Sequence, residues 1–208
     1  MIIKVKSPGR INLIGEHTDY NGGYVLPGAI NKAINFEIFK VKKVYCEVKS
    51  AKINKSLIFE INNIKKSETH WHNYILGTID YFLSKKNKIT PFKCSIKSNL
   101  PIGSGISSSS ALISGFAKAI IELFELKYSK SDIVKIVSYV ERNFIGLRGG
   151  IMDQFTINYG LKDNLILLNC DNSSYNYIQF KSKSFCILLL NTNVKHSLIN
   201  SAYNDRVN

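Results

Sequence analysis

Two different hydrophobic periodicities occur along this 208-residue chain, and together they restrict its fold to the α+β class. Apolar residues alternate with polar ones at Ile34, Phe36 and Ile38, and again over 44–49, which is the pattern of half-buried strands. From about Trp71 the apolar residues instead recur every three or four positions, on one face of a helix. The sequence therefore predicts a mixed sheet with helices packed on one side.

The second half of the chain continues this mixture of strands and helices. A strand near 92–96 leads into a Gly/Ser-rich loop, and helical spacing of apolar residues then predicts helices over about 112–123 and 133–140. We expect Ser131 to cap the second of these helices. Strand-like runs follow at 165–168, 177–180 and 185–190, and residues 195–208 look like the start of a further helix.

The composition excludes several classes of protein. Hydrophobic residues make up 45% of the chain and aromatic residues 11%, which excludes wholesale disorder. No apolar run approaches the roughly 20 residues that a membrane-spanning helix requires. Residues 1–6 lack the apolar centre and cleavage site of a signal peptide. The four cysteines form no Cys-x-x-Cys pair, which favours isolated thiols. We therefore expect a cytoplasmic protein without a membrane partner.

The net charge of +13 raises the question of nucleic-acid binding. The 28 basic residues comprise 24 lysines and 4 arginines, and the lysines are scattered in small groups without interleaved aromatic residues. This arrangement is typical of a solvated surface, so we expect no nucleic-acid partner. Because arginine is scarce, each one is a stronger candidate for a bidentate contact with an oxyanion.

Residues 9–23 (Gly-Arg-Ile-Asn-Leu-Ile-Gly-Glu-His-Thr-Asp-Tyr-Asn-Gly-Gly) concentrate polar groups beside apolar neighbours. A strand followed by a hairpin turn explains the Asn-Gly-Gly at its end. It does not explain why Arg10, Glu16, His17 and Asp19 lie within ten residues. Two carboxylates and an imidazole can bind the hydroxyl groups of a sugar. The segment therefore predicts polyol recognition, with Arg10 facing a phosphoryl charge.

Residues 101–110 (Pro-Ile-Gly-Ser-Gly-Ile-Ser-Ser-Ser-Ser) immediately precede a predicted helix. Glycines allow the backbone to approach a phosphate closely, and the free N–H groups at the start of a helix favour an anion. No lysine stands where a Walker A loop requires one, so an ordinary P-loop is excluded. The alternative is a Gly/Ser connector whose serines cap the helix.

Residues 146–155 (Gly-Leu-Arg-Gly-Gly-Ile-Met-Asp-Gln-Phe) place a single carboxylate, Asp153, shortly after a pair of glycines. A helix cap is one interpretation of this aspartate, and a catalytic carboxylate is the other. His70 and His72, which flank Trp71, are interpreted as surface residues at a helix start rather than as metal ligands.

In this order, the three segments resemble the galactokinases, members of the GHMP superfamily of small-molecule kinases. Residues 9–21 resemble the galactokinase signature, residues 101–110 the phosphate loop, and residues 150–154 the stretch that holds the catalytic aspartate. Two shorter matches agree with them: Trp-His-Asn-Tyr at 71–74, and residues 192–198 followed by Tyr203.

The resemblance implies the GHMP-kinase N-terminal domain, a ribosomal-protein-type β-α-β fold, over residues 1–208. Within it, residues 1–35 would form a sugar-recognition segment, and residues 100–126 the phosphate loop with its helix. Residues 195–208 would begin a C-terminal domain that is otherwise absent, because family members run to nearly twice this length. We expect a monomer if the chain is complete.

The resemblance also implies phosphorylation of galactose at its C1 hydroxyl by ATP and Mg²⁺. Asp153 and Arg10 would be catalytic. The sugar would contact Glu16, His17, Asp19, Gly150 and Tyr203. The nucleotide would contact Trp71, Tyr74, Gly103, Ser104, Gly105, Ser107, Ser108 and Ser109. The ligands of Mg²⁺ would be Ser108, Ser109 and Glu141. Glu141 would lie on the helix that precedes Asp153.

Two other functions remain open at this point. One is a kinase for another hexose, such as N-acetylgalactosamine. The other is a non-catalytic sensor that binds galactose and ATP, which the short chain favours and the intact Ser107–Ser110 and Asp153 disfavour.

Overall fold

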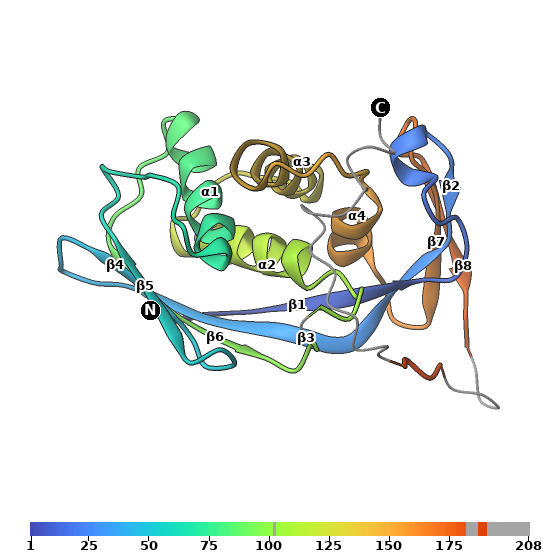
Figure 1. Cartoon of the computed structure of the whole chain (residues 1–208), viewed down its shortest axis with the longest axis horizontal. Coiled ribbons are helices and arrows are strands. Elements are labelled where there is room, and N and C mark those ends of the chain that lie inside the picture. The colour runs from blue at the N-terminus through green and yellow to red at the C-terminus, as the bar shows by residue number, and fades with distance from the viewer. Residues whose placement is uncertain (102, 182–186, 191–208) are drawn as a thin grey trace.

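A five-stranded mixed sheet forms one layer of the structure, and the helices pack over one of its faces (Figure 1). The computed structural model describes residues 1–101, 103–181 and 187–190. The sheet has the order β1-β3-β6-β4-β5; β4 and β6 pair in parallel, and the other neighbours pair antiparallel. Its strands are β1 (Ile3–Asn12), β3 (Pro27–Lys40), β4 (Cys46–Ser50), β5 (Lys55–Phe59) and β6 (Phe92–Ser98). The expected α+β layering is confirmed.

The main hydrophobic core lies between this sheet and the helices. The helices are α1 (His70–Ser84), α2 (Ser108–Leu123), α3 (Lys130–Val140) and α4 (Met152–Tyr159). Phe36 from β3, Phe92 from β6 and Phe116 from α2 are completely or almost completely buried, and the rings of Phe92 and Phe116 lie 5.9 Å apart. The alternating and helical apolar residues of the sequence thus meet in one core, where each removes apolar surface from water.

A second, three-stranded sheet stands at the end of the molecule beyond α4. It consists of β2 (Tyr24–Val25), β7 (Asn164–Asn169) and β8 (Tyr175–Gln179), in the order β2-β7-β8. Val25, Ile166 and Leu168 pack with Met152 and Phe155 of α4 in a small separate cluster. This sheet was not predicted as a separate unit, because its pairing depends on strands that lie far apart in the chain.

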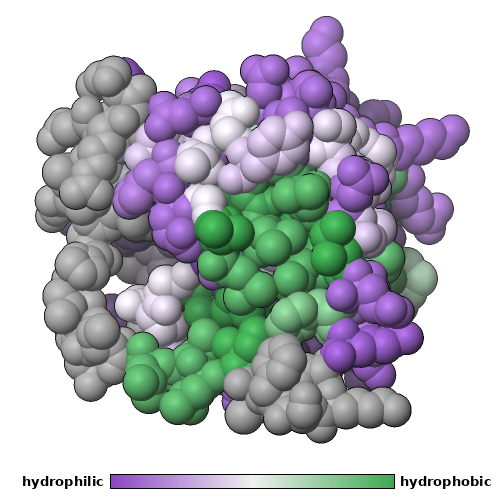
Figure 2. Space-filling view, turned by 90° about the vertical axis from the view of Figure 1, so that its right-hand side faces the viewer, coloured by the Kyte–Doolittle hydropathy of each residue, from purple (hydrophilic) through white to green (hydrophobic). Residues whose placement is uncertain are grey.

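The surface on the side of the second sheet is strongly apolar. Figure 2 shows a continuous hydrophobic surface on this side of the molecule, where β2, β7 and β8 lie. Large exposed apolar side chains occur in these strands and next to them in the chain. They include Ile14, which is 65% exposed, Leu13 and Ile178. Contiguous apolar surface of this kind is unusual on a soluble monomer.

The end of the chain and one helix cap differ from the sequence-based expectations. Ser131 does not cap α3: the N-cap is Ser129, whose side chain accepts from the N–H of Asp132 while Asp132 accepts in return. This capping box satisfies two free N–H groups at once, which Ser131 cannot do from inside the helix. A strand was expected at 185–190. Residues 187–190 have no regular structure, so the prediction is wrong there, and residues 185–186 lie outside the described residues. The expected helix at 195–208 also lies outside them.

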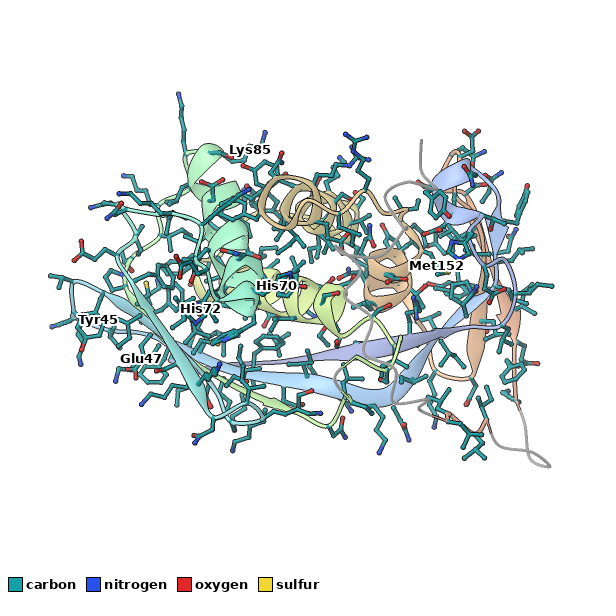
Figure 3. The ribbon with its side chains drawn as sticks, viewed as in Figure 1. Tyr45, Glu47, His70, His72, Lys85 and Met152 are labelled. Carbon is teal, nitrogen blue, oxygen red and sulfur yellow. The ribbon has the colours of Figure 1, made fainter. Side chains whose placement is uncertain are left out.

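The elements that were not predicted include β5, α4, the two-residue β2 and a 3₁₀ turn at Asp19–Asn21. The α4 helix is only eight residues long, too short for a helical periodicity to stand out. His70 and His72 do lie at the start of α1 (Figure 3), with His70 exposed and His72 paired with Ser67 at 2.9 Å. Within the described part of the chain, no helix combines the length and the apolar character needed to cross a bilayer.

The close crossing of α2 over the sheet gives a test of the packing. A Cβ atom at Gly115 would lie 2.3 Å from the ring of Phe36 and 2.7 Å from Ser7 Cβ. We expect Gly115→Ala to destabilise the fold by about 1–3 kcal/mol, the usual cost of overpacking a core, measured by urea unfolding. Lys118→Ala, at an exposed position of the same helix, should change stability by less than about 0.5 kcal/mol. Equal stability of the two variants would contradict this packing.

Candidate active site

The end of β1 is tied to the Gly/Ser loop by Arg10. The Arg10 backbone N–H donates to the carbonyl of Ile106 at 3.2 Å, and its Nη1 donates to the carbonyl of Gly105 at 2.6 Å. The register of β1 against β3 shifts between Pro8 and Arg10, so a β-bulge precedes the arginine. Bulges commonly re-aim a side chain beside a functional site. Here the result is an arginine that contacts the loop with both its backbone and its side chain.

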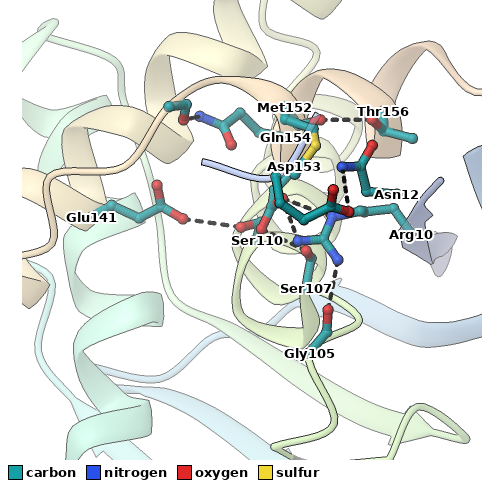
Figure 4. A network of polar contacts seen from close by, with 12 residues as sticks. Arg10, Asn12, Gly105, Ser107, Ser110, Glu141, Met152, Asp153, Gln154 and Thr156 are labelled. Atoms are coloured by element: carbon teal, nitrogen blue, oxygen red, sulfur yellow. Dashed lines mark hydrogen bonds and ion pairs between the residues drawn. The ribbon is translucent and has the colours of Figure 1, made fainter. Parts of the chain in front are cut away.

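The guanidinium of Arg10 also holds the carboxylate of Asp153, which lies 143 residues further along the chain (Figure 4). Arg10 Nη2 and Nε lie 2.7 and 2.8 Å from Asp153 Oδ1. Ser107 Oγ donates to the other oxygen, Oδ2, at 2.5 Å. Asp153 is not the N-cap of α4, since Ile151 occupies that position. The cap interpretation of Asp153 is therefore wrong, and the carboxylate belongs to a tertiary cluster instead.

The loop between β1 and β2 folds around Thr18. Its Oγ1 donates to the carbonyls of Gly15 at 2.8 Å and Tyr24 at 2.9 Å, and its own carbonyl accepts from the N–H of Gly23 at 2.8 Å. These bonds close the loop on itself. Glu16 and His17 are exposed at its tip, while Asp19 is half-buried and directed inward.

The backbone of Gly150 lies directly against the carboxylate of Asp19. A Cβ atom at position 150 would lie 2.2 Å from Asp19 Oδ2, so any side chain larger than hydrogen would collide with that carboxylate. Burial raises the pKa of Asp19, and the nearby negative charge of Asp153 raises it further. Asp19 thus lies against the backbone of Gly150, which carries no side chain, and close to the carboxylate of Asp153.

The loop that precedes α2 enters the helix through three residues with a left-handed backbone. Ser107 has a left-handed backbone, with φ of 59°, and directs the chain into the 16-residue α2. Gly103 and Gly105 also have positive φ, and a Cβ at either would meet nothing within 4 Å. The first turn of a helix leaves its N–H groups without partners in the helix, which favours an anion there.

Glu141 is a buried carboxyl group at the end of α3. It begins a π-helical turn, Glu141–Ile145, that continues α3, so its expected place on that helix is close to correct. The side chain accepts a hydrogen bond from Ser110 Oγ at 3.0 Å, and both residues are buried. Burial raises the pKa of Glu141 to about 8, with a further contribution from the charge of Asp153. A cation bound beside it would favour the charged form.

Two adjoining cavities open at this cluster, and they share one wall. The polar cavity, about 690 Å³, is lined by the acidic residues and by Arg10, and the apolar cavity, about 790 Å³, contains Trp71 and Tyr74. The shared wall consists of Gly103, Ser108, Ser109, Glu141 and Leu147. A ligand that occupies both cavities must therefore pass the start of α2.

The structure brings most of the candidate residues into these two cavities. Those that line the polar cavity are Arg10, Glu16, His17, Asp19, Gly103, Gly105, Ser107, Ser108, Ser109, Glu141, Gly150 and Asp153. Those that line the apolar cavity are Trp71, Tyr74, Gly103, Ser108, Ser109 and Glu141. Ser104 lines neither, and its hydroxyl donates back to the carbonyl of Pro101 at 3.0 Å. Tyr203 lies outside the described residues.

Sequence reasoning missed several polar residues at or beside the site, among them Asn12 and Ser110. Asn12 lines the polar cavity and donates through Nδ2 to Glu16 at 3.2 Å. Its position two residues after Arg10 in a strand could have indicated a shared face. Ser110 was passed over because nothing in the sequence distinguishes it from Ser108 and Ser109, and only the packing of α3 shows that it meets Glu141.

Comparison with known proteins identifies two family signatures in the chain. Residues 73–161 match the GHMP kinases N terminal domain, and residues 3–38 match the galactokinase galactose-binding signature. The galactokinase of Thermotoga maritima is 44% identical over 204 residues, which is 98% of this chain and 57% of that protein. The galactokinase of Limosilactobacillus fermentum is 39% identical over 97% of this chain and 53% of its own length.

Solved structures show the same relationship. The Lactococcus lactis galactokinase, crystallised with galactose, has a TM-score of 0.91 and 32% identity, and the match covers 99% of this chain and 54% of that one. The Methanococcus jannaschii mevalonate kinase has a TM-score of 0.69 and 26% identity, with 88% and 56% covered. The chain thus spans little more than half the length of these relatives. It matches the GHMP kinases N terminal domain over residues 73–161, and nearly its whole length is similar to these galactokinases.

Proposed function

We propose that the chain binds galactose and MgATP in adjoining cavities and transfers the γ-phosphoryl group of ATP to the C1 hydroxyl of galactose. The observation that carries this proposal is the Arg10–Asp153 pair, which places a cation and a carboxylate together in the polar cavity. Phosphoryl transfer depends mainly on positioning of the reactants and on stabilisation of charge. The carboxylate of Asp153 can position the hydroxyl group of the sugar, and the guanidinium of Arg10 can stabilise negative charge.

Galactose would occupy the polar cavity. Glu16, His17 and Asp19 line it together with Gly150 and offer several acceptors for sugar hydroxyls. We include Tyr203 in this set on the family resemblance. Residues 1–35 would then be the sugar-recognition segment of a domain that extends over 1–208, with 195–208 leading into the remainder of the family's fold.

ATP would occupy the apolar cavity with its base and reach the polar cavity with its phosphates. Trp71 and Tyr74 line the apolar cavity and would flank the base. The shared wall holds Gly103, Ser108 and Ser109, so the phosphates would lie against the start of α2 within residues 100–126. Gly105 and Ser107 would contact the phosphates from the polar side. Ser104, whose hydroxyl is bonded within the loop, would contribute its backbone.

Ser108, Ser109 and Glu141 fit a Mg²⁺ ion that is shared with nucleotide phosphates. The described residues contain no cluster of three or more His, Cys, Asp or Glu suited to a metal. Mg²⁺ bound with a nucleotide characteristically takes one or two protein carboxylates and completes its shell with phosphates and water. The buried carboxyl of Glu141, beside two serine hydroxyls, meets that requirement. When bound, the ion would neutralise charge on the transferring phosphoryl group.

Asp153 would accept the proton of the C1 hydroxyl, or orient that hydroxyl, while the C1 oxygen forms its bond to phosphorus and the bond to ADP breaks. A carboxylate has about four acceptor positions. Arg10 uses two of them on Oδ1, and Ser107 uses one on Oδ2, so Oδ2 keeps a place for the substrate. Arg10 would stabilise the charge of the phosphoryl group in transit.

Binding of the sugar gives the first test. Calorimetric titration of galactose, with and without Mg²⁺ and AMPPNP, should show saturable binding to the chain. Asp19→Ala should weaken it by about 10–100-fold, the effect of losing a charged hydrogen-bond partner. Glu122→Ala, on the far part of α2, should leave it unchanged. Failure of the unaltered chain to bind galactose would overturn the proposal, and tighter binding of N-acetylgalactosamine would change the substrate.

The second test separates binding from chemistry. Asp153→Asn keeps the shape of the side chain but removes its charge, so ADP formation in the presence of galactose should fall by about 10²–10⁴-fold. Galactose affinity should stay within about threefold, a change of less than about 0.7 kcal/mol. ADP release is followed in a coupled assay. Galactose binding without any ADP formation by the unaltered chain would favour the sensor over the kinase.

The third test uses the contact between Gly150 and Asp19. Gly150→Ala should displace the Asp19 carboxylate and weaken galactose binding by about tenfold or more, since a collision at 2.2 Å cannot be absorbed by rigid backbone. Binding of AMPPNP in the apolar cavity serves as the internal control and should change little. Unchanged galactose affinity would show that Asp19 does not contact the sugar.

A further inference from the structure

Ser110 contacts the one buried carboxyl group in the wall between the two cavities. Its hydroxyl donates to Glu141 Oε1 at 3.0 Å, with Ser110 only 1% exposed and Glu141 6% exposed. A serine in a helix can bond to the carbonyl four residues earlier. Here the hydroxyl leaves α2 and reaches the end of α3 instead, so the contact joins two elements.

The backbone of Glu141 is fixed independently of this contact. Its carbonyl accepts from the N–H of Gly146, which closes the π turn, and from the N–H of Leu147 at 2.8 Å. The side chain has less support: within the described residues, Ser110 provides the only hydrogen bond given to the carboxyl group. The direction in which the Glu141 carboxyl points therefore depends on Ser110.

We propose that Ser110 is a positioning residue that aims Glu141 at the shared wall of the two cavities, where it would bind the Mg²⁺ of the nucleotide complex. This inference rests on the proposed function, because it assumes a metal ion at Ser108, Ser109 and Glu141. Groups that orient a metal ligand through a hydrogen bond typically change metal affinity by about 10–100-fold when they are removed. Ser110 has no contact with the ligand itself in this arrangement and acts through Glu141.

A second buried serine on the same helix provides a matched control. Ser114 lies one turn further along α2, is also 1% exposed, and accepts from Asn158 Nδ2 at 3.1 Å. It is absent from the linings of both cavities. Ser110→Ala and Ser114→Ala therefore remove the same group from comparable surroundings, and only the first removes a partner of Glu141.

The test uses Trp71, the single tryptophan of the chain, which lines the apolar cavity, so a nucleotide bound there is expected to change its fluorescence. AMPPNP is titrated with and without Mg²⁺, and the ratio of the two dissociation constants measures how much the metal strengthens binding. Ser110→Ala should reduce this ratio by about tenfold or more. Ser114→Ala should leave it unchanged, although both variants should lower the melting temperature to a similar extent. In a Glu141→Gln background, Ser110→Ala should have no further effect on the ratio.

The outcomes separate this inference from the function on which it rests. If Mg²⁺ does not strengthen AMPPNP binding to the unaltered chain, the proposed metal site is wrong. If it does, and Ser110→Ala keeps the full ratio or changes it no more than Ser114→Ala, then Ser110 has a structural role only and the inference is overturned.

Discussion

The repulsion among three carboxyl groups in one cavity is the constraint on which the site depends. Asp19, Glu141 and Asp153 line the same polar cavity, and the charge of Asp153 raises the pKa of both of the others. The fold compensates each group in a different way. Arg10 pairs with Asp153, and backbone N–H groups stabilise Asp19, while Glu141 has a serine hydroxyl. A cation bound in the cavity would offset this repulsion and favour the charged form of Glu141.

The start of α2 links the two halves of the proposed reaction. It forms a wall of both cavities, so in the proposed complex one short segment would face the sugar on one side and the nucleotide on the other. The helix that follows is packed into the main core through Phe116 and Ile120, which supports this wall. Rigid support is what positioning of two reactants requires. The side chains proposed to take part in the reaction therefore lie on loops and helix ends that the core supports.

Local patterns predicted the layers of the fold but not the relations between distant segments. The alternation at Ile34, Phe36 and Ile38 and the helical face from Trp71 both follow from burial against a common core, so each is visible locally. Three contacts of the site join separate elements of the fold. They are the pairing of Arg10 with Asp153, the close approach of Gly150 to Asp19, and the hydrogen bond from Ser110 to Glu141. Neither residue of such a pair shows a periodicity that indicates the other. For the candidate residues, the family resemblance supplied this missing information.

The large sequence separation between Arg10 and Asp153 affects how the protein folds. A pair separated by 143 residues closes a very long loop, and the entropy lost in that closure has to be offset by contacts that form at the same stage. Early collapsed intermediates, held by local helix and hairpin contacts, would lack the pair. We therefore expect the Arg10–Asp153 pair to form late in folding, together with the docking of α4 beside β1, and a nascent chain released before residue 153 lacks the carboxylate of the pair.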